Sequence, residues 1–252
     1  MVAPMMLSMT AGSMAGHLAQ RAFGSYRLPI PRPSGSDVQI VAPNVDGFAE
    51  DWSLNTDDLR LWVCLSELSY HVVLDQPHVR ARLDRLLADY VDGFQADPGA
   101  LEEHFGALDA SALSDPSGLQ KLFGDPEVLL GAVRSERQKR LLPQLEALVC
   151  VVAGYVDRVM DVVAARVLGS GGRLAEAVRR DRVEAGDADR FVERLLGLEL
   201  GQATFDRGVA FVDGVVERAG EDGLDRLWES ERTLPTPAEV DAPGLWLARI
   251  DL

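Results

Sequence analysis

Long apolar segments with helical periodicity dominate the chain. One is LRLWVCLSELSYHVVLD, which follows a polar start at residues 55–58 and ends before Pro77. The other is LEALVCVVAGYVDRVMDVVAARVL, within residues 135–168. Both are apolar nearly all around, so they are predicted to be buried helices. Further helices are predicted at residues 5–23, 77–94, 173–184, 187–199, 203–219 and 221–229, with a short last one at WLARI.

The best strand candidate lies between the first two predicted helices. SYRLPIPRPSGS contains too many prolines for a helix. DVQIVA (residues 37–42) follows it and combines β-branched residues with a subsequent Pro-Asn break. The predicted fold class is therefore mainly α (α+β), with a small β-sheet near the N-terminus at residues 26–42.

Composition narrows the classes of function. The 252-residue chain has 25 Lys and Arg against 40 Asp and Glu, for a formal net charge of −15. Such a charge repels nucleic acid and anionic membranes, so neither is expected as a partner. The N-terminal segment lacks a basic n-region and is interrupted by His17, Gln20 and Arg21, which argues against a signal peptide or a membrane span. His17 is expected at a surface.

The two cysteines, Cys64 and Cys150, lie inside the two apolar helices. A thiol in such a place usually acts as a small hydrophobic group, and free thiols are typical of a reducing compartment. We therefore expect a cytoplasmic protein. Only two of the 25 basic residues are lysines, Lys121 and Lys139, a preference that indicates a bacterial genome rich in G and C.

The first apolar helix contains the spacing of a zinc-binding motif. Zinc peptidases of the zincin type place two histidines at i and i+4 on one helix, with a glutamate after the first histidine as general base. In SELSYH (residues 66–71), Glu67 stands at the glutamate position, but Ser66 and Tyr70 stand at the two histidine positions. Neither serine nor tyrosine is a usual zinc ligand.

Longer blocks around this motif resemble a known family. The blocks are AGSMAGHLAQRAFGSYRLPIPRP, VAPN, DLRLWVCLSELSYHVV, AGYVDRVMD and DRLWESERTLPTPAEVDAPGLWLARI. Together they cover nearly the whole chain and resemble a zincin-like bacterial family of uncharacterised hydrolases, often named in connection with deazaflavin coenzyme biosynthesis. The resemblance implies a single zincin-like, metalloprotease-like domain over residues 1–252. It also implies a short form, without the helical region that precedes this segment in family members.

The same resemblance implies a degenerate metal site. Family members resemble L-H-E-x-T-H at the first block, so Ser66 and Tyr70 are former metal positions and Glu67 is the relic of the general base. In the distal block the family resembles E-G-[YH]-x-x-x-x-M-D, whose leading glutamate is the implied third ligand. Ala153 stands at that position. The surrounding second shell is then expected to comprise Tyr155, Asp157, Asp161 and His71.

The polar residues of these helices leave several interpretations open. Glu67 and His71 are spaced i,i+4 and could pair, or Glu67 could be satisfied by structural hydrogen bonds, or it could be retained as a catalytic base. Asp157 and Asp161 lie on an otherwise apolar helix and need polar partners. The candidate partners are Arg158, Ser66 and Tyr70.

Two other sites are weaker candidates. His71 and Asp75 are also spaced i,i+4 and could form a different metal site with His78 and His104, but a lone pair of ligands binds metal weakly. Ser66 could act as a nucleophile, yet it lacks a nucleophile elbow, and the next residue of a helix points about 100° away.

Two hypotheses of function follow. In the first, the chain is a non-catalytic pseudo-metallopeptidase, a binding or scaffolding module without a cofactor and with a protein or peptide as partner. In the second, it is a zinc-dependent metallohydrolase or metallopeptidase that uses an altered ligand set around Glu67. We favour the first, because both histidines of the motif are replaced. Either hypothesis requires the helices at residues 55–75 and 144–168 to lie side by side.

Overall fold

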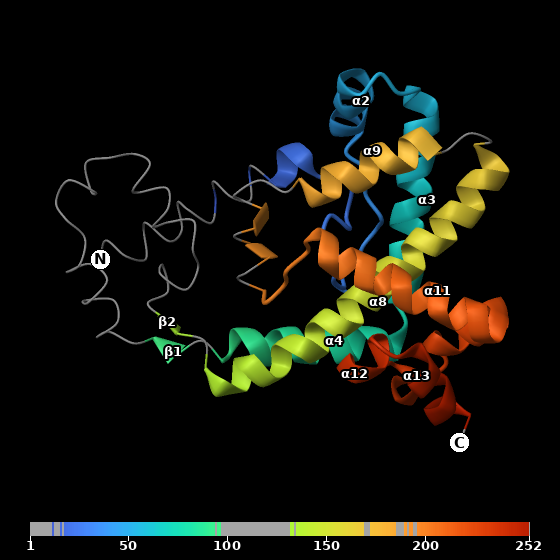
Figure 1. The fold of residues 1–252 in the computed structure, drawn as a ribbon. Coiled ribbons are helices and arrows are strands. Elements are labelled where there is room, and N and C mark those ends of the chain that lie inside the picture. The colour runs from blue at the N-terminus through green and yellow to red at the C-terminus, as the bar shows by residue number, and fades with distance from the viewer. Residues whose placement is uncertain are drawn as a thin grey trace. The chain divides into compact units, whose positions relative to one another are not determined.

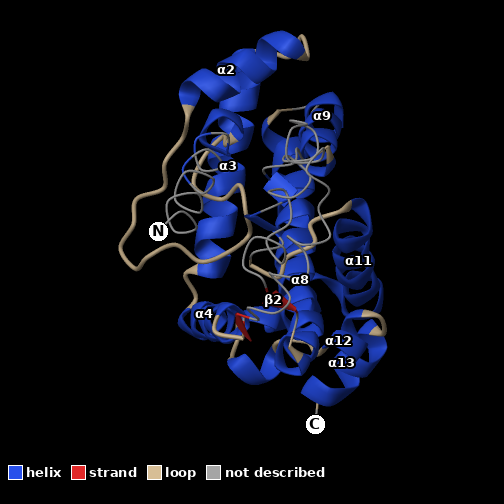
Figure 2. Cartoon of the chain, turned by 90° about the vertical axis from the view of Figure 1, so that its left-hand side faces the viewer, coloured by secondary structure: helices blue, strands red, loops and turns tan. Residues whose placement is uncertain are grey.

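The fold is described from a computed structural model. Its described residues are 12, 16, 18–93, 95–96, 132–133, 135–168, 172–184, 189–190, 192–193 and 196–251. In this part of the chain, helices predominate and strands are very short (Figure 1; Figure 2). The prediction of a mainly α fold is confirmed. His17 and His104, two of the candidate residues, lie outside the described residues.

The long helices follow one another along the chain with bounds close to those predicted, whereas the helices predicted at 5–23 and 187–199 lie partly outside the described residues. They are α2 (Ala42–Asp51), α3 (Thr56–Leu74), α4 (Pro77–Val91), β1 (Gln95–Ala96), β2 (Ala132–Val133), α8 (Glu136–Val167), α9 (Gly172–Val183), α11 (Gln202–Asp225), the 3₁₀ turns η1 (Arg226–Trp228) and η2 (Glu231–Thr233), α12 (Pro237–Val240) and α13 (Pro243–Ile250). The strands β1 and β2 pair antiparallel. The helix α2 was not predicted.

The chain divides into two compact units. One comprises residues 1–20, 86–142 and 185–199, and the other comprises residues 21–85, 143–184 and 200–252. In the first unit, the Gln138 side-chain amide donates a hydrogen bond to the Tyr90 carbonyl at 3.0 Å. In the second unit lie all the candidate site residues that the structure describes, from Ser66 to Asp161. The candidate functional site therefore lies in the second unit.

Helix α3 begins where its local sequence predicts. The side-chain oxygen of the N-cap residue Asn55 accepts a hydrogen bond from the backbone N–H of Asp58 at 2.9 Å. Asp57 and Asp58 lie in the first turn, where acidic side chains interact favourably with the helix dipole. The helix ends at Leu74, shortly before Pro77. These local signals define the helix that carries the motif.

The predicted strand at residues 37–42 forms very little β-structure. It makes one isolated antiparallel bridge, between Gly24 and Ile40. The reason is that α2 begins already at Ala42, with a proline in its first turn, so the chain leaves the extended path after a few residues. Among the described residues, the small sheet expected at 26–42 is thus reduced to this bridge.

An apolar core lies where α8, α11 and the C-terminal helices pack together (Figure 1). The rings of Phe211 and Trp246 are fully buried there and meet edge to face, with centroids 5.6 Å apart. Helices α8 and α11 approach each other backbone to backbone at Gly154 and Gly208: a Cβ atom on Gly208 would lie only 1.9 Å from the carbonyl oxygen of Cys150. This contact fixes the rotation of α8 and so determines which residues its other faces present.

Two further expectations concern the state of the cysteines and the absence of a membrane span. Cys150 is buried and Cys64 is half-buried, and both thiols are free. Within the described part of the chain, none of the helices combines the length and the apolar character that crossing a membrane requires.

Candidate functional site

Glu67 is buried on α3 and tied to a loop. Only 6% of the residue is exposed. Its carboxylate accepts a hydrogen bond from the backbone N–H of Tyr26 at 2.9 Å, and the neighbouring N–H of Ser25 donates to the Gln39 carbonyl at 3.1 Å. Burial raises the pKa of Glu67 to about 7, although the two N–H groups act to lower it. A Cβ atom on Gly24 would lie 2.5 Å from the Glu67 carboxyl carbon, so the loop backbone packs directly on this group.

Tyr26 connects this loop to the next turn of α3. Its hydroxyl lies 2.8 Å from Nδ1 of His71, and its ring stacks on that of Tyr70 with centroids 6.1 Å apart. Glu67 and His71 therefore both bond to Tyr26, one through the backbone and one through the side chain. Structural hydrogen bonding of Glu67 is therefore observed, and its retention as a catalytic base stays a prediction.

Tyr70, at the second histidine position, faces an arginine for which the sequence holds no local signal. Arg182 of α9 donates a hydrogen bond to the Tyr70 hydroxyl. The same guanidinium donates two hydrogen bonds to Asp157 of α8, from Nη1 to Oδ1 at 2.9 Å and from Nη2 to Oδ2 at 2.7 Å. Its carbon lies 3.7 Å from the centre of the Phe205 ring. Tyr70 and Asp157 thus share one guanidinium, so α3 and α8 are adjacent here as the resemblance implied.

The electrostatics of this group follow from its burial. Tyr70 is 7% exposed, and burial raises its pKa to about 12, so the phenol is neutral. Burial by itself lowers the pKa of Arg182, but the hydrogen bonds and the charge of Asp157 outweigh it, so the pKa is raised. The side chains of Arg182 and Asp157 expose only 21% and 13%. A charged ion pair is therefore held between the helices, largely shielded from water.

The other residues of the predicted second shell lie apart from this group. Asp161 is exposed and accepts a hydrogen bond from Arg179 at 2.7 Å. Tyr155 packs on the C-terminal core, where its ring meets that of Trp228 with centroids 5.1 Å apart. Residues 155 and 157 differ by two positions and so face nearly opposite sides of α8. Of Tyr155, Asp157 and Asp161, only Asp157 bonds to Arg182 beside Tyr70.

The predicted partners of the two carboxylates need correction. Arg158 donates to Glu221 rather than to either aspartate. Arginines of α9 bind Asp157 and Asp161, and Tyr70 meets Asp157 only through Arg182. The arginine-rich sequence RRDR (residues 179–182) was a signal that α9 could neutralise buried acids. Nothing local indicated which acid each arginine would reach.

The residues at the implied ligand positions do not fit zinc. Ser66 is half-buried and Ala153 is fully buried, and with Tyr70 they supply none of the imidazole, thiolate or carboxylate donors that zinc sites use. Asp157, the nearby carboxylate, is bound by Arg182. Across the described residues, no three His, Cys, Asp or Glu side chains come together in a way that could hold a metal ion. The alternative site is weakened too, because Asp75 pairs with Arg80.

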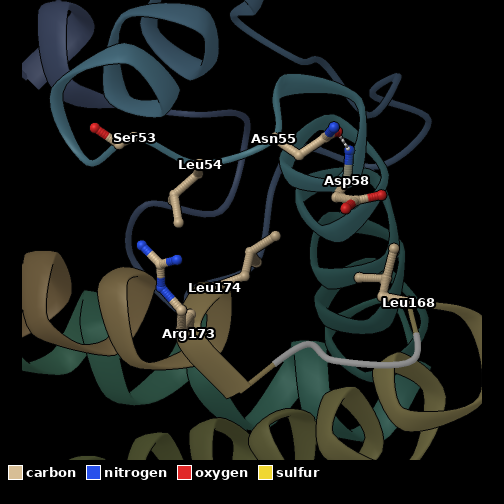
Figure 3. A pocket seen from close by; sticks show the side chains of 7 residues that line it. All are labelled: Ser53, Leu54, Asn55, Asp58, Leu168, Arg173 and Leu174. Carbon is tan, nitrogen blue, oxygen red and sulfur yellow. Dashed lines mark hydrogen bonds between the residues drawn. The ribbon is translucent and has the colours of Figure 1, made fainter.

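The described pockets lie elsewhere in the second unit. One, of about 150 Å³, is formed where the loop before α3 meets the start of α9 (Figure 3). Arg173 and Leu174 contribute from α9, and Asn55 and Asp58 from α3. Another, of about 410 Å³, is lined mainly by residues of the C-terminal segment 231–237 together with arginines. None of the candidate site residues lines either pocket.

Comparisons with known proteins agree with the predicted family and with the mainly α fold. Residues 1–247 match the model of a family described as zincin-like metallopeptidase. Among solved structures, the chain is similar to a protein from Chloroflexus aurantiacus described as a "putative hydrolase with a novel fold", with a TM-score of 0.67 and 26% identity over 95% of this chain and 67% of that chain. Comparison with curated proteins yields no match. Because the family model spans nearly the whole chain, the protein belongs to the zincin-like metallopeptidase family.

Proposed function

We propose that this chain is a non-catalytic member of its family, which acts as a binding or scaffolding module. The observation that carries the proposal is the donor set at the former metal site. Ser66, Tyr70 and Ala153 offer no usual zinc ligand, and the Arg182 guanidinium bonds to Tyr70 between α3 and α8. A zinc peptidase needs three protein ligands and an open position for water, and these residues provide neither.

The environment of Glu67 supports the same proposal. A general base must lie within hydrogen-bond reach of the water or substrate group that it deprotonates. The Glu67 carboxylate instead accepts a hydrogen bond from the backbone N–H of Tyr26 and is largely covered by that loop. Its present role is to hold the loop on α3.

The surface of α3 favours a protein or peptide as the partner. Leu61, Leu68 and Val72 are 40%, 50% and 62% exposed. Their spacing of seven and four residues places them on one side of the helix. An exposed apolar stripe of this kind is typical of surfaces that bind other polypeptides. The free thiols are the basis on which we place the protein in the cytoplasm.

One observation favours the alternative, a metallohydrolase with an altered ligand set around Glu67. Burial raises the pKa of Glu67 to about 7, which is the range in which a general base works best near neutral pH. In that case the metal would need a nitrogen ligand near Glu67, and His71, one turn along α3, would provide it.

Metal analysis and activity assays together test the proposal. The purified chain, dialysed against zinc and then against buffer, is expected to retain far less than one zinc per chain and to hydrolyse neither peptides nor esters above a Glu67→Gln control. His71→Ala is the matched variant for the alternative. About one zinc per chain that is lost in His71→Ala, or hydrolysis that is lost in Glu67→Gln, would overturn the proposal.

A further inference from the structure

A single guanidinium of α9 contacts three other helices at the former metal site. Arg182 comes from α9, and it bonds to Tyr70 of α3 and Asp157 of α8. Its face lies on the Phe205 ring of α11, at 3.7 Å from the ring centre. Exposure differs among the other ion pairs of this unit: Arg85 and Glu231 are each 51% exposed, whereas Arg27 and Asp181 are each 14% exposed.

The tyrosine at the second histidine position explains why a polar partner such as Arg182 is needed here. A tyrosine hydroxyl extends further from its Cα atom than a histidine ring nitrogen does. Tyr70 therefore does not replace a ligand but reaches into the space beyond the ligand position. Its oxygen is buried there and needs a polar partner, because an unsatisfied buried hydroxyl is destabilising. Arg182 is that partner.

Charge balance leads to the same residue. A carboxylate that is 13% exposed, as the Asp157 side chain is, requires compensation by a positive charge or by several hydrogen bonds. In a metal-containing site the dication contributes positive charge nearby. Here the guanidinium fork supplies both the charge and two parallel hydrogen bonds, a geometry that carboxylates accept well and that lysine cannot reproduce.

We propose that Arg182 is a built-in cation which takes over, in this chain, the charge and the helix-bridging role of the metal ion, with Tyr70 and Asp157 as its ligands. The inference rests on the proposed non-catalytic function, and it adds how the emptied site stays folded. A site of this kind selects guanidinium over other cations, because planarity and N–H direction matter as much as charge.

Chemical rescue tests the cation role directly. The observed hydrogen bonds of Arg182 to Asp157 use Nη atoms, and Nε has no partner among the described residues, so a free guanidinium ion can reproduce them. Weak ion binding has dissociation constants of about the millimolar range, so about 10–20 mM guanidinium chloride is a suitable concentration. In Arg182→Ala, this salt is expected to raise the midpoint temperature of unfolding relative to sodium chloride at the same concentration. The parent chain is expected to show no rise. Equal responses of parent and variant, or no rise in either, would contradict the proposal.

Two further variants keep the test informative if Arg182→Ala folds poorly. Arg182→Lys retains a charge without the fork and is expected to remain clearly less stable than the parent. In Arg182→Ala/Asp157→Asn the unpaired charge is removed as well, so this double variant is expected to be more stable than Arg182→Ala alone. If Arg182 contributed only by packing, the double variant would instead be less stable than Arg182→Ala, because the Asp157→Asn substitution would add its own loss of stability.

Zinc titration separates this inference from the proposed function. The variant Ser66→His/Tyr70→His/Ala153→Glu restores three zinc donors while Arg182 remains beside them. Adding Arg182→Ala to it is expected to tighten zinc binding at least tenfold in calorimetry, because a fixed cation then no longer opposes the metal. Equal affinities of the two folded variants would overturn the inference on Arg182. The proposed function is judged on zinc and hydrolysis in the natural chain, so the two can fail separately.

Discussion

Two faces of helix α8 pack against neighbouring helices through different kinds of contact. Toward α11 it is apolar, and the backbones touch at Gly154 and Gly208 with no side chain between them. Toward α3 and α9 it presents Asp157, and the space between the helices holds a buried ion pair and a phenol. Both contacts are buried in the same unit, so the difference lies in chemistry rather than in exposure.

The comparison shows that shape alone can hold one face of a helix, whereas a face that buries a carboxylate also needs a balancing charge. The apolar face depends on shape alone, and it is unaffected by changes at positions such as Ser66. The packing of the polar face depends on charge balance as well as on shape. Its carboxylate, Asp157, is balanced by the guanidinium of Arg182. Four measurements can break or sharpen this contrast.

The largest effect is expected on the polar face. Replacing Arg182 by methionine keeps an apolar stem on Phe205 but leaves Asp157 buried without its partner. Removing one member of a buried ion pair typically lowers the free energy of unfolding by about 3–5 kcal/mol. Urea denaturation measures this. Arg180→Met, on the exposed side of the same helix, is the control, and a loss of similar size there would show that the ion pair has no special role.

On the apolar face, Gly208→Ala is expected to lower the free energy of unfolding by about 3 kcal/mol, at the upper end for overpacking. The added methyl carbon would lie 1.9 Å from the Cys150 carbonyl oxygen, so the two helices must separate. Gly47→Ala is the matched control, because that helical glycine has nothing within 4 Å of the new carbon. The control is expected to be neutral or slightly stabilising. Equal stabilities would mean that the helices do not touch here.

The burial of Glu67 predicts a pH dependence. Its pKa is raised from 4.5 to about 7 in the folded chain, so folding favours the protonated form. The contribution to stability is therefore fully present below pH 4.5 and is lost as the pH rises through about 7. Between pH 5 and 8 this amounts to about 2.5 kcal/mol. Glu67→Gln cannot titrate and is expected to lack this decline; an unchanged profile in the variant would assign it to other groups.

The smallest effect provides the baseline for exposed pairs. Arg85 and Glu231 form an ion pair in which both side chains are 51% exposed. Water screens such a pair, so Arg85→Ala is expected to lower the free energy of unfolding by about 0.5 kcal/mol or less. Double-mutant analysis with Glu231→Ala measures the coupling. A coupling near that of Arg182 with Asp157 would remove the distinction between surface and buried pairs in this protein.

Much of the helical framework could be predicted from the sequence. The N-cap Asn55, the acids in the first turn and the stop before Pro77 are local signals, and α3 has the bounds that they indicate. The sequence also predicted that Ser66 and Tyr70 stand at the zinc-donor positions of the motif, because the motif needs defined residue types at a defined spacing, and this stays a prediction. The strand at 37–42 was overestimated, since its β-branched residues resemble a strand whether or not a partner strand exists.

Only the tertiary structure decided which side chains surround Tyr70 and Glu67. Arg182 looks like any other arginine of an amphipathic helix, and Tyr70 lies more than a hundred positions before it in the chain. Likewise, the bond of Glu67 to Tyr26 joins residues 41 positions apart. Helix formation depends on neighbours three or four residues away, so the sequence by itself determines it. The pairing of a buried charge depends on how whole helices cross, and that is determined by packing over the entire unit.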